Sequence, residues 1–421
     1  MSFSTLRISV KCVLLFFCSM QSFSHVHAGG SDDGWNQYRG PNRNGISLSR
    51  IIPKQWGEDG PELIWKRKIG VGFSGISVSG QQLFTMFAED SSEFLGSFDQ
   101  GTGLEKWRFP IGKIFIDDLG NGPRATPTID GDLVFALSSN GDLFAVHKNS
   151  GQKVWHVSLK KKFQAKGPRR GFSTAPLIQQ DLVIVYAGGG AGMALIALDK
   201  SSGTTKWTAF DGGASHSSPI AAFVGGKQHN IFAASRLVEK KPYYETVSIS
   251  NEGKTLWTAP ALPGVIAMPV FLPPDKVFVS GSNDDGCSVI QIIQSPDSLY
   301  TREVWKNRNM KNHFNSSIYF QNHLYGFNKA TLTCLDARTG DIKWRKRGHG
   351  KGALILAGNM LMVLSDRGKL SLIKLTGDDF ETLCSAQVMK GKSWTSPTYI
   401  NGKFFARNQS EMVCYDLAPN N

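Results

Sequence analysis

Short runs of alternating apolar and polar residues fill the chain from about residue 63 to its end. Leu143–His147 (LFAVH), Leu195–Asp199 (LIALD) and Leu332–Asp336 (LTCLD) are typical, and glycines and polar clusters separate such runs. Alternation with a period of two over about five residues predicts half-buried β-strands. The chain is therefore predicted to be all-β.

Tryptophan recurs along these runs at intervals of 39 to 52 residues. Five copies have a glycine four residues before the ring, and three have an aspartate eight residues before it, as in LDKSSGTTKW. The aspartate can cap the turn's amides, the glycine supplies a positive φ, and the ring can bury itself on a neighbouring sheet. The predicted structural tryptophans are Trp65, Trp107, Trp155, Trp207, Trp257, Trp305 and Trp344.

Each repeat holds four strands, and eight repeats can be counted. The fifth and seventh repeats are degenerate, so seven units is the competing count. The last repeat stops after Val413–Asp416, one strand short, whereas Leu63–Lys66 is a fourth strand with no first three ahead of it. Pairing these ends would close the ring and remove its open edges. The prediction is an eight-bladed β-propeller of four-stranded antiparallel blades, with Trp65 beside Tyr415.

The repeat units resemble those of the PQQ-type (quinoprotein-like) β-propeller family. Trp35–Gly45 (WNQYRGPNRNG), Gly122–Pro127 (GPRATP) and Lys311–His313 (KNH) resemble its uncharacterised exported bacterial members. The family also includes quinoprotein alcohol dehydrogenases and the outer-membrane assembly lipoprotein of the β-barrel machinery. The resemblance covers about residues 35–416 and implies a fold more than a function, since one fold hosts many activities.

The first residues are typical of a secretory signal, with Arg7 and Lys11 ahead of an apolar stretch and a small-residue cleavage site ending at Ala28. We expect residues 1–28 to be a signal peptide, 29–62 an extension packed on the propeller, and 63–417 the propeller itself. The protein is expected to be exported to the periplasm or beyond the cell, monomeric, and not membrane-spanning. The four cysteines that follow the signal form no CxxC motif and no disulfide framework.

Positive charge is concentrated in the segments that link one repeat's last strand to the next repeat's first strand. These links hold 21 of the 45 Lys and Arg that follow residue 28, and three acids, Asp117, Asp118 and Asp211. In a propeller all such links lie on one face around the axis. A concave site of one sign of charge draws in anions, although charge runs are often only a solvated rim.

One position just before each first strand is expected to line the channel mouth. Aligning the links gives Phe73, Arg124, Phe172, His216, Ile266, Phe314, Lys351 and Trp394, with His313 and Asn315 beside Phe314. Cations and aromatic faces together suit sugars and planar anions, although each ring alone could equally cap the core. The predicted ligand-binding residues are Arg124, Phe172, His216, His313, Lys351 and Trp394.

The leading functional hypothesis is a binding or scaffold propeller whose mouth takes an anionic or carbohydrate ligand or a protein partner. No catalytic residues, metal ligands, cofactor or nucleic-acid partner are assigned. One alternative implied by the resemblance is a quinoprotein alcohol dehydrogenase with PQQ and Ca²⁺. The chain lacks the adjacent cysteines that many of those enzymes carry, and it has no haem motif. The other alternative is a scaffold for outer-membrane protein assembly.

Overall fold

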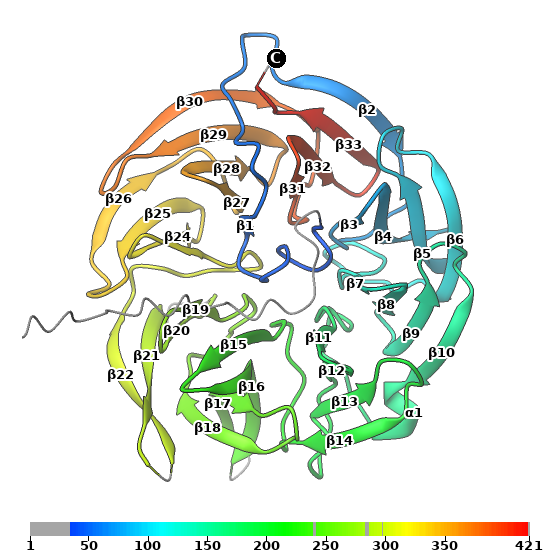
Figure 1. Ribbon diagram of the computed structural model, residues 1–421, viewed down its shortest axis with the longest axis vertical. Coiled ribbons are helices and arrows are strands. Elements are labelled where there is room, and N and C mark those ends of the chain that lie inside the picture. Colours follow the sequence, from blue (N-terminus) through cyan, green and yellow to red (C-terminus); the bar gives the residue numbers. More distant parts are fainter. Residues whose placement is uncertain (1–33, 239–240, 283–285, 297, 420–421) are drawn as a thin grey trace, which may run out of the picture.

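Eight antiparallel sheets stand as blades around a central axis in the computed structural model, which describes residues 34–238, 241–282, 286–296 and 298–419 (Figure 1). Within each blade the strands follow the chain from the axis outward. Blade 1 consists of β3 (Ser77–Ser79), β4 (Gln82–Glu89), β5 (Ser92–Asp99) and β6 (Glu105–Lys113), and blade 2 of β7 (Thr128–Asp130), β8 (Leu133–Leu137), β9 (Asp142–His147) and β10 (Lys153–Ser158). Blade 3 consists of β11 (Leu177–Gln179), β12 (Leu182–Tyr186), β13 (Leu195–Asp199) and β14 (Thr205–Ala209). Blade 4 consists of β15 (Ile220–Val224), β16 (Lys227–Val238), β17 (Lys241–Ile249) and β18 (Thr255–Pro260).

The other four blades repeat this order and confirm the count of eight. Blade 5 consists of β19 (Val270–Leu272), β20 (Lys276–Ser280), β21 (Cys287–Gln294) and β22 (Leu299–Asn307), and blade 6 of β23 (Ile318–Phe320), β24 (His323–Asn328), β25 (Thr331–Asp336) and β26 (Ile342–Lys346). Blade 7 consists of β27 (Ala353–Ala357), β28 (Met360–Leu364), β29 (Lys369–Leu375) and β30 (Phe380–Gln387). Blade 8 consists of β31 (Thr398–Ile400), β32 (Lys403–Arg407) and β33 (Glu411–Asp416), with β2 (Glu62–Lys68) as its outer strand.

The two ends of the chain complete blade 8 together, as predicted. β2 pairs antiparallel with β33, with Leu63 opposite Tyr415 and Trp65 opposite Cys414. The outer strand of blade 8 therefore comes from the start of the propeller and its other three strands from the end. This pairing leaves no unmatched first or last blade, so the ring closes without an open sheet edge between its ends.

The repeated tryptophans fasten each blade to the next one. The Trp155 ring of blade 2 lies against Gly203 in the outer turn of blade 3, where a Cβ would stand 2.8 Å from the ring. Its Nε1 donates to the carbonyl of Lys200 in the same turn, at 2.9 Å. Trp65, Trp107, Trp207 and Trp305 make the same pair of contacts with the turns that hold Gly103, Gly151, Gly253 and Gly340.

The degenerate repeats lack this fastening. Trp257 of blade 4 instead donates to His229 in its own blade, at 3.1 Å, because blade 5 has no glycine at the docking position. Trp344 of blade 6 packs on Phe380 of blade 7, with ring centroids 4.4 Å apart. The glycine therefore provides both the turn conformation and the bare surface on which an indole can lie.

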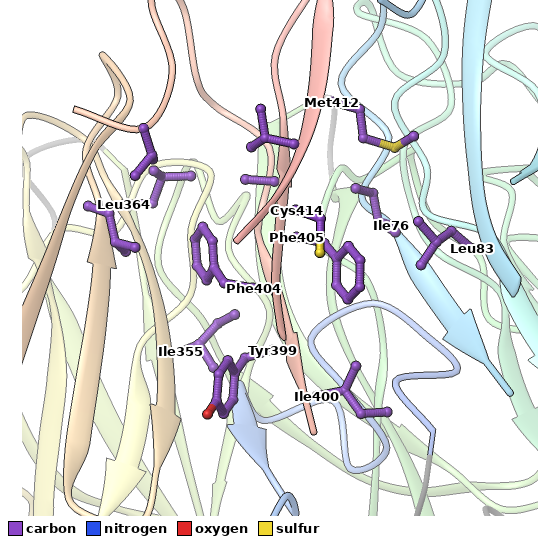
Figure 2. Close-up of a cluster of buried hydrophobic side chains, with 14 of the residues drawn as sticks. Ile76, Leu83, Ile355, Leu364, Tyr399, Ile400, Phe404, Phe405, Met412 and Cys414 are labelled. Carbon is purple, nitrogen blue, oxygen red and sulfur yellow. The ribbon is translucent and has the colours of Figure 1, made fainter. Parts of the chain in front are cut away.

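The core lies between neighbouring blades, and Figure 2 shows how one inner strand serves two interfaces. Phe404 of β32 points toward Ile355 and Leu364 of blade 7. The next residue, Phe405, points the other way, toward Leu83 of blade 1. Successive strand residues face opposite sides of a sheet, so an inner strand buried on both sides is continuously apolar.

An N-terminal segment, residues 35–47, lies across the axis and forms hydrogen bonds with seven of the eight blades. β1 (Ile46–Ser47) adds a parallel fifth strand to blade 7, beside β27. The fully buried guanidinium of Arg39 donates to the carbonyls of Ser316 and Ser317, and that of Arg43 to those of Ala175, Pro176 and Pro219. Trp35, Asn36 and Ser47 form hydrogen bonds with Val78 of blade 1, Ile129 of blade 2 and Tyr399 of blade 8, respectively.

The expected signal peptide, residues 1–28, lies outside the described residues. Among the residues that are described, the α-helix is α1 (Leu159–Phe163), in the link between blades 2 and 3, and no helix has the length and apolar character to cross a membrane. Cys287, Cys334 and Cys414 are buried free thiols, and Cys384 is a half-buried one.

Candidate functional site

A pocket of about 220 Å³ opens on the axis, at the face where the links between blades converge. Its walls are formed by the links that precede the inner strands. Tyr38 of the N-terminal segment also lines it. Arg39 and Arg43 of that segment donate to carbonyls that follow the pocket-lining residues in the chain, just before the inner strands, so the segment lies beneath the pocket in the channel. For comparison, a dry cavity of about 150 Å³ is enough to hold benzene.

One side of the pocket is a stack of three aromatic rings. The Trp394 indole, from the link before blade 8, stacks with Phe314 and with Phe73, at ring-centroid distances of 5.0 Å and 6.0 Å and interplanar angles of 29° and 24°. The Lys392 ammonium sits 4.5 Å from the Trp394 centroid and donates to the carbonyl of Leu119 at 2.7 Å. These rings form a platform for a flat ligand face, with a cation over the Trp394 ring.

Another part of the wall carries two arginines that share one carboxylate. Arg170 donates to Asp117 at 2.9 Å, and Arg124 lies 3.3 Å from the same carboxyl oxygen. Arg124 also donates to the carbonyls of Gly120 and Gly122, and its guanidinium lies over Phe73 and Phe115. Burial alone would raise the pKa of Asp117, but the Leu119 N–H and the two arginines lower it.

A buried carboxyl lies behind this cluster. Glu93 is fully buried and accepts hydrogen bonds from the backbone N–H groups of Phe115 and Ser139. Burial raises its pKa, against the pull of those bonds and of Arg124. Glu93 thus holds together two loops that shape the arginine side of the pocket.

The remaining polar groups are uncharged and incompletely bonded. His216 shares a 2.8 Å hydrogen bond with Ser173, while His313 Nδ1 and Asn315 Nδ2 are buried and have no partner among the described residues. Burial lowers the pKa of His216 to about 4, helped by Arg124 and Arg170. Burial also lowers the pKa of His313 to about 4, helped by Lys351. Both imidazoles are therefore neutral near pH 7.

Six of the eight aligned link positions line the pocket. They are Phe73, Arg124, His216, Ile266, Phe314 and Trp394, and His313 and Asn315 line it too. Of the predicted ligand-binding residues, the structure thus brings together Arg124, His216, His313 and Trp394.

Phe172 and Lys351 lie outside the pocket wall. Phe172 is only 1% exposed, and its ring packs on Gly141 and Gly167 in the core, so it cannot touch a pocket ligand. The lining position of that link is taken by Ser173. Lys351 is half-buried, its backbone N–H donates to Asp366, and it acts on the pocket only through its charge near His313.

Ten of the eighteen residues of the pocket wall were not predicted as lining positions, and three of them, Tyr38, Asp117 and Arg170, carry rings or charges that shape the site. Asp117 and Arg170 belong to links already noted for their charge. No sequence pattern indicated, however, that two residues 53 positions apart would form an ion pair. Because Asp117 pairs with both arginines, its carboxylate offsets positive charge of the pocket wall at the place where the two arginines gather.

Within the described part of the chain, no group of three or more His, Cys, Asp or Glu side chains could hold a metal ion. Ca²⁺ takes six to eight oxygen ligands, usually with several carboxylates. The pocket wall offers one carboxylate, Asp117, and it is already bonded to two arginines and to the Leu119 N–H. These residues do not fit the Ca²⁺ that accompanies PQQ in the dehydrogenases.

Solved structures with little sequence identity share the architecture. BamB from Moraxella catarrhalis is 14% identical, with a TM-score of 0.58 over 88% of this chain and 99% of that one. Quinohemoprotein alcohol dehydrogenase from Comamonas testosteroni is 10% identical, with a TM-score of 0.60 over 92% and 81%. The computationally designed Ika8 protein is 12% identical, with a TM-score of 0.58 over 85% and 100%.

No curated protein matches the sequence. A family model does, over residues 91–264 and 245–421, which is most of the chain. That model is described as outer membrane protein assembly factor BamB. The protein therefore belongs to the BamB-type family of PQQ-like repeat β-propellers.

Proposed function

We propose that this protein is an exported binding propeller whose axial pocket takes a small ring-shaped ligand, a sugar or an acidic sugar. The single observation behind this is the pairing of an aromatic platform with buried polar atoms that have no partner. Asn315 is 6% exposed, its Nδ2 makes no bond within the described chain, and it shares the pocket with Trp394. A buried donor without an acceptor costs stability, and a ligand oxygen would satisfy it.

The other pocket groups support the same ligand class. A pyranose ring presents a flat C–H face for Trp394 and hydroxyls for neutral imidazoles, amides and serines. Arg170 is about a third exposed at its side chain, at 31%, so it can meet a carboxylate, whereas Arg124 is 9% exposed and is used internally. A uronic acid would use both the platform and Arg170.

The test is calorimetric titration of the protein with galacturonate and galactose. Trp394→Ala is expected to weaken both ligands about tenfold, a loss of about 1.4 kcal/mol. Arg170→Ala is expected to weaken galacturonate alone, more at low salt than at high salt. Arg169→Ala, an exposed neighbour outside the pocket wall, is the matched control. Equal affinities for all variants, or no binding of either sugar, would refute the proposal.

We propose that this binding needs neither PQQ nor Ca²⁺, because the pocket's oxygen donors do not suit the metal. Addition of PQQ with Ca²⁺ is then expected to leave the melting temperature and dye-linked alcohol oxidation unchanged. A ligand that binds the folded state at 100 times its dissociation constant would stabilise the protein by about 2.7 kcal/mol. A rise of that kind, with oxidation, would favour the dehydrogenase alternative.

A second candidate function, a scaffold in outer-membrane protein assembly, is supported by the family match over residues 91–421. In that role the protein would bind a protein partner through a face or a sheet edge. Analytical ultracentrifugation with a purified β-barrel assembly complex tests it. If the Trp394→Ala variant still sediments with the assembly complex, the scaffold role is separate from sugar binding. If the unaltered protein does not sediment with the complex, the result counts against the scaffold role.

A further inference from the structure

A continuous basic surface lies outside the pocket, on the same face of the ring. It is formed by three segments: residues 345–351 between blades 6 and 7, residues 365–369 in the β28–β29 hairpin, and residues 387–393 between blades 7 and 8. Together they hold eight Lys and Arg and one acid, Asp366. We call its six exposed members the basic arc: Arg345, Arg347, Arg367, Lys369, Lys390 and Lys392.

Backbone hydrogen bonds hold the three segments side by side. Asp366 N–H donates to the His349 carbonyl, and the Asp366 carbonyl accepts from Ser393. The N–H groups of Val388 and Met389 both donate to the Gly368 carbonyl. The arc is therefore a built surface with a fixed arrangement rather than a set of independent loops.

The charges of the arc are mostly uncompensated. Of its six side chains, Lys392 bonds a carbonyl, and the other five form no ion pair within the described chain. Asp366 is half-buried, and its carboxylate accepts the Lys351 N–H. Nearby Glu411 is paired with Lys66. Bases gathered without acids repel each other, so this surface costs the free protein stability that an anionic partner would recover.

The arc has no apolar anchor. Its exposed positions are Arg, Lys, Gln and Gly, and none of the exposed large hydrophobic side chains lies in the three segments. A specific interface with a folded protein usually has an apolar or aromatic centre. Single-stranded nucleic acid is usually bound with stacking aromatics along the groove. The surface suits a chain of repeated negative charges instead.

The inner end of the arc reaches the pocket. Lys392 is a member of the arc, and its ammonium lies over Trp394, which lines the pocket. A polymer along the arc could thus place its last ring on the aromatic platform. An anionic membrane is too broad to enter the channel, so this continuity favours a polymer over a lipid surface.

We propose that the basic arc binds an extended acidic polysaccharide, whose terminal sugar occupies the axial pocket. The choice of a sugar polymer rests on the proposed function of the pocket. The arc itself stands on its own charge and geometry, so the two ideas can fail separately. Long-range attraction to the arc would also raise the rate at which the polymer finds the pocket.

The experiment compares polygalacturonate with its monomer galacturonate, using the full mature protein. The variant is Arg347→Ala/Arg367→Ala/Lys369→Ala/Lys390→Ala. The matched control removes four lysines on the opposite side of the ring, near α1: Lys160→Ala/Lys161→Ala/Lys162→Ala/Lys166→Ala (Figure 1). Melting curves of both variants establish that they are folded.

The arc variant is expected to bind the polymer about tenfold more weakly, since each exposed ion pair contributes up to a few-fold. Its affinity for the monomer should be unchanged, and the salt dependence of polymer binding should become shallower. The control variant should lose about twofold or less in affinity for the polymer, because only its net charge has changed.

Three results would overturn the inference while leaving the pocket proposal intact. The arc variant could bind the polymer as tightly as the unaltered protein, or the control could lose as much as the arc variant. Alternatively, arc-dependent binding to vesicles rich in anionic lipid could exceed binding to the polymer. If Trp394→Ala weakens the monomer as proposed while the arc variant still binds the polymer normally, the binding site is confined to the pocket. Binding of neither sugar would remove both proposals.

Discussion

Two histidines in the pocket, His216 and His313, are kept neutral by their surroundings. His216 faces Arg124, Arg170 and Asp117, and His313 lies near Lys351. Burial lowers both pKa values from 6.5 to about 4. Between pH 6.5 and about 4 the unfolded chain binds protons on these histidines that the folded chain does not. The free energy of unfolding must therefore fall as the pH falls through this range.

The first prediction is therefore a loss of stability on acidification. Between pH 6.5 and about 4 the two histidines should lower the free energy of unfolding by on the order of 5 kcal/mol in total, with little effect of theirs above pH 6.5. Urea denaturation at several pH values measures this. His216→Asn/His313→Asn should flatten the slope, whereas exposed His147→Asn should not. Identical slopes in all three proteins would contradict the assignment.

Two neighbouring asparagines allow binding and stability to be separated. Asn312 is satisfied: its Nδ2 donates to the Phe327 carbonyl and its Oδ1 accepts from Ser317. Asn315 Oδ1 accepts from Ser396, but its Nδ2 has no partner within the described residues.

The second prediction is that Asn312→Ala lowers the free energy of unfolding by about 1–3 kcal/mol, because it leaves buried partners unbonded. Asn315→Ala should change stability by less than about 1 kcal/mol, because it removes an unsatisfied donor along with one hydrogen bond. Asn315→Ala should, however, weaken galacturonate. Chemical denaturation and calorimetry on both variants test this. A larger stability loss for Asn315→Ala would indicate a purely structural role.

At the scale of the element, the blade-to-blade fastening depends on glycine having no side chain. Gly203 has φ +70°, and a Cβ there would stand 2.8 Å from the Trp155 ring. Gly131 also has a positive φ, +56°, but nothing lies within 4 Å of its Cβ position. The two glycines separate backbone strain from the loss of docking.

The third prediction compares Gly203→Ala with Gly131→Ala. Gly131→Ala should cost about 1 kcal/mol of backbone strain alone. Gly203→Ala should cost about 2–4 kcal/mol, because the indole must also move off the turn. Trp155→Ala should cost about 3–5 kcal/mol. Equal losses for the two glycine variants would show that the ring contact contributes nothing.

At the scale of the whole molecule, stability depends on a closed ring. The β2–β33 pair shuts the blades, and the N-terminal segment ties seven of them from inside the channel. Arg39 and Arg43 are buried without a carboxylate, yet five of their six side-chain nitrogens donate to oxygens, and Arg39 Nε is the exception. Burial lowers the pKa of both guanidiniums.

The fourth prediction concerns that closure. A chain ending at Ser410 lacks β33 and exposes the edges of β2 and β32, so we expect aggregates instead of a cooperatively melting monomer. A chain ending at Ala418 keeps β33 and should melt within about 3 °C of the full chain. Size-exclusion chromatography and calorimetry distinguish them. A soluble, cooperative chain ending at Ser410 would contradict closure by these strands.

The sequence by itself determined the repeat and the way the ends meet, and it favoured eight blades over seven. Each of these rests on local patterns: alternation within a strand, a glycine four residues before a tryptophan, and a surplus strand at one end matching a deficit at the other. The positions next to the inner strands also follow from the repeat, and this is why Phe73, Arg124, His216 and Trp394 were found. An equivalent place in a repeat predicts an equivalent place around the axis.

Only the tertiary structure decided which of those side chains reach the pocket and what charge it carries. Phe172 turned into the core, and Asp117 paired with two arginines and so reduced the positive charge of the wall. Tyr38 entered from a segment outside the repeat. The physical reason is that side-chain direction and ion pairing depend on contacts between links distant in sequence, and the curvature of the closed ring sets those distances.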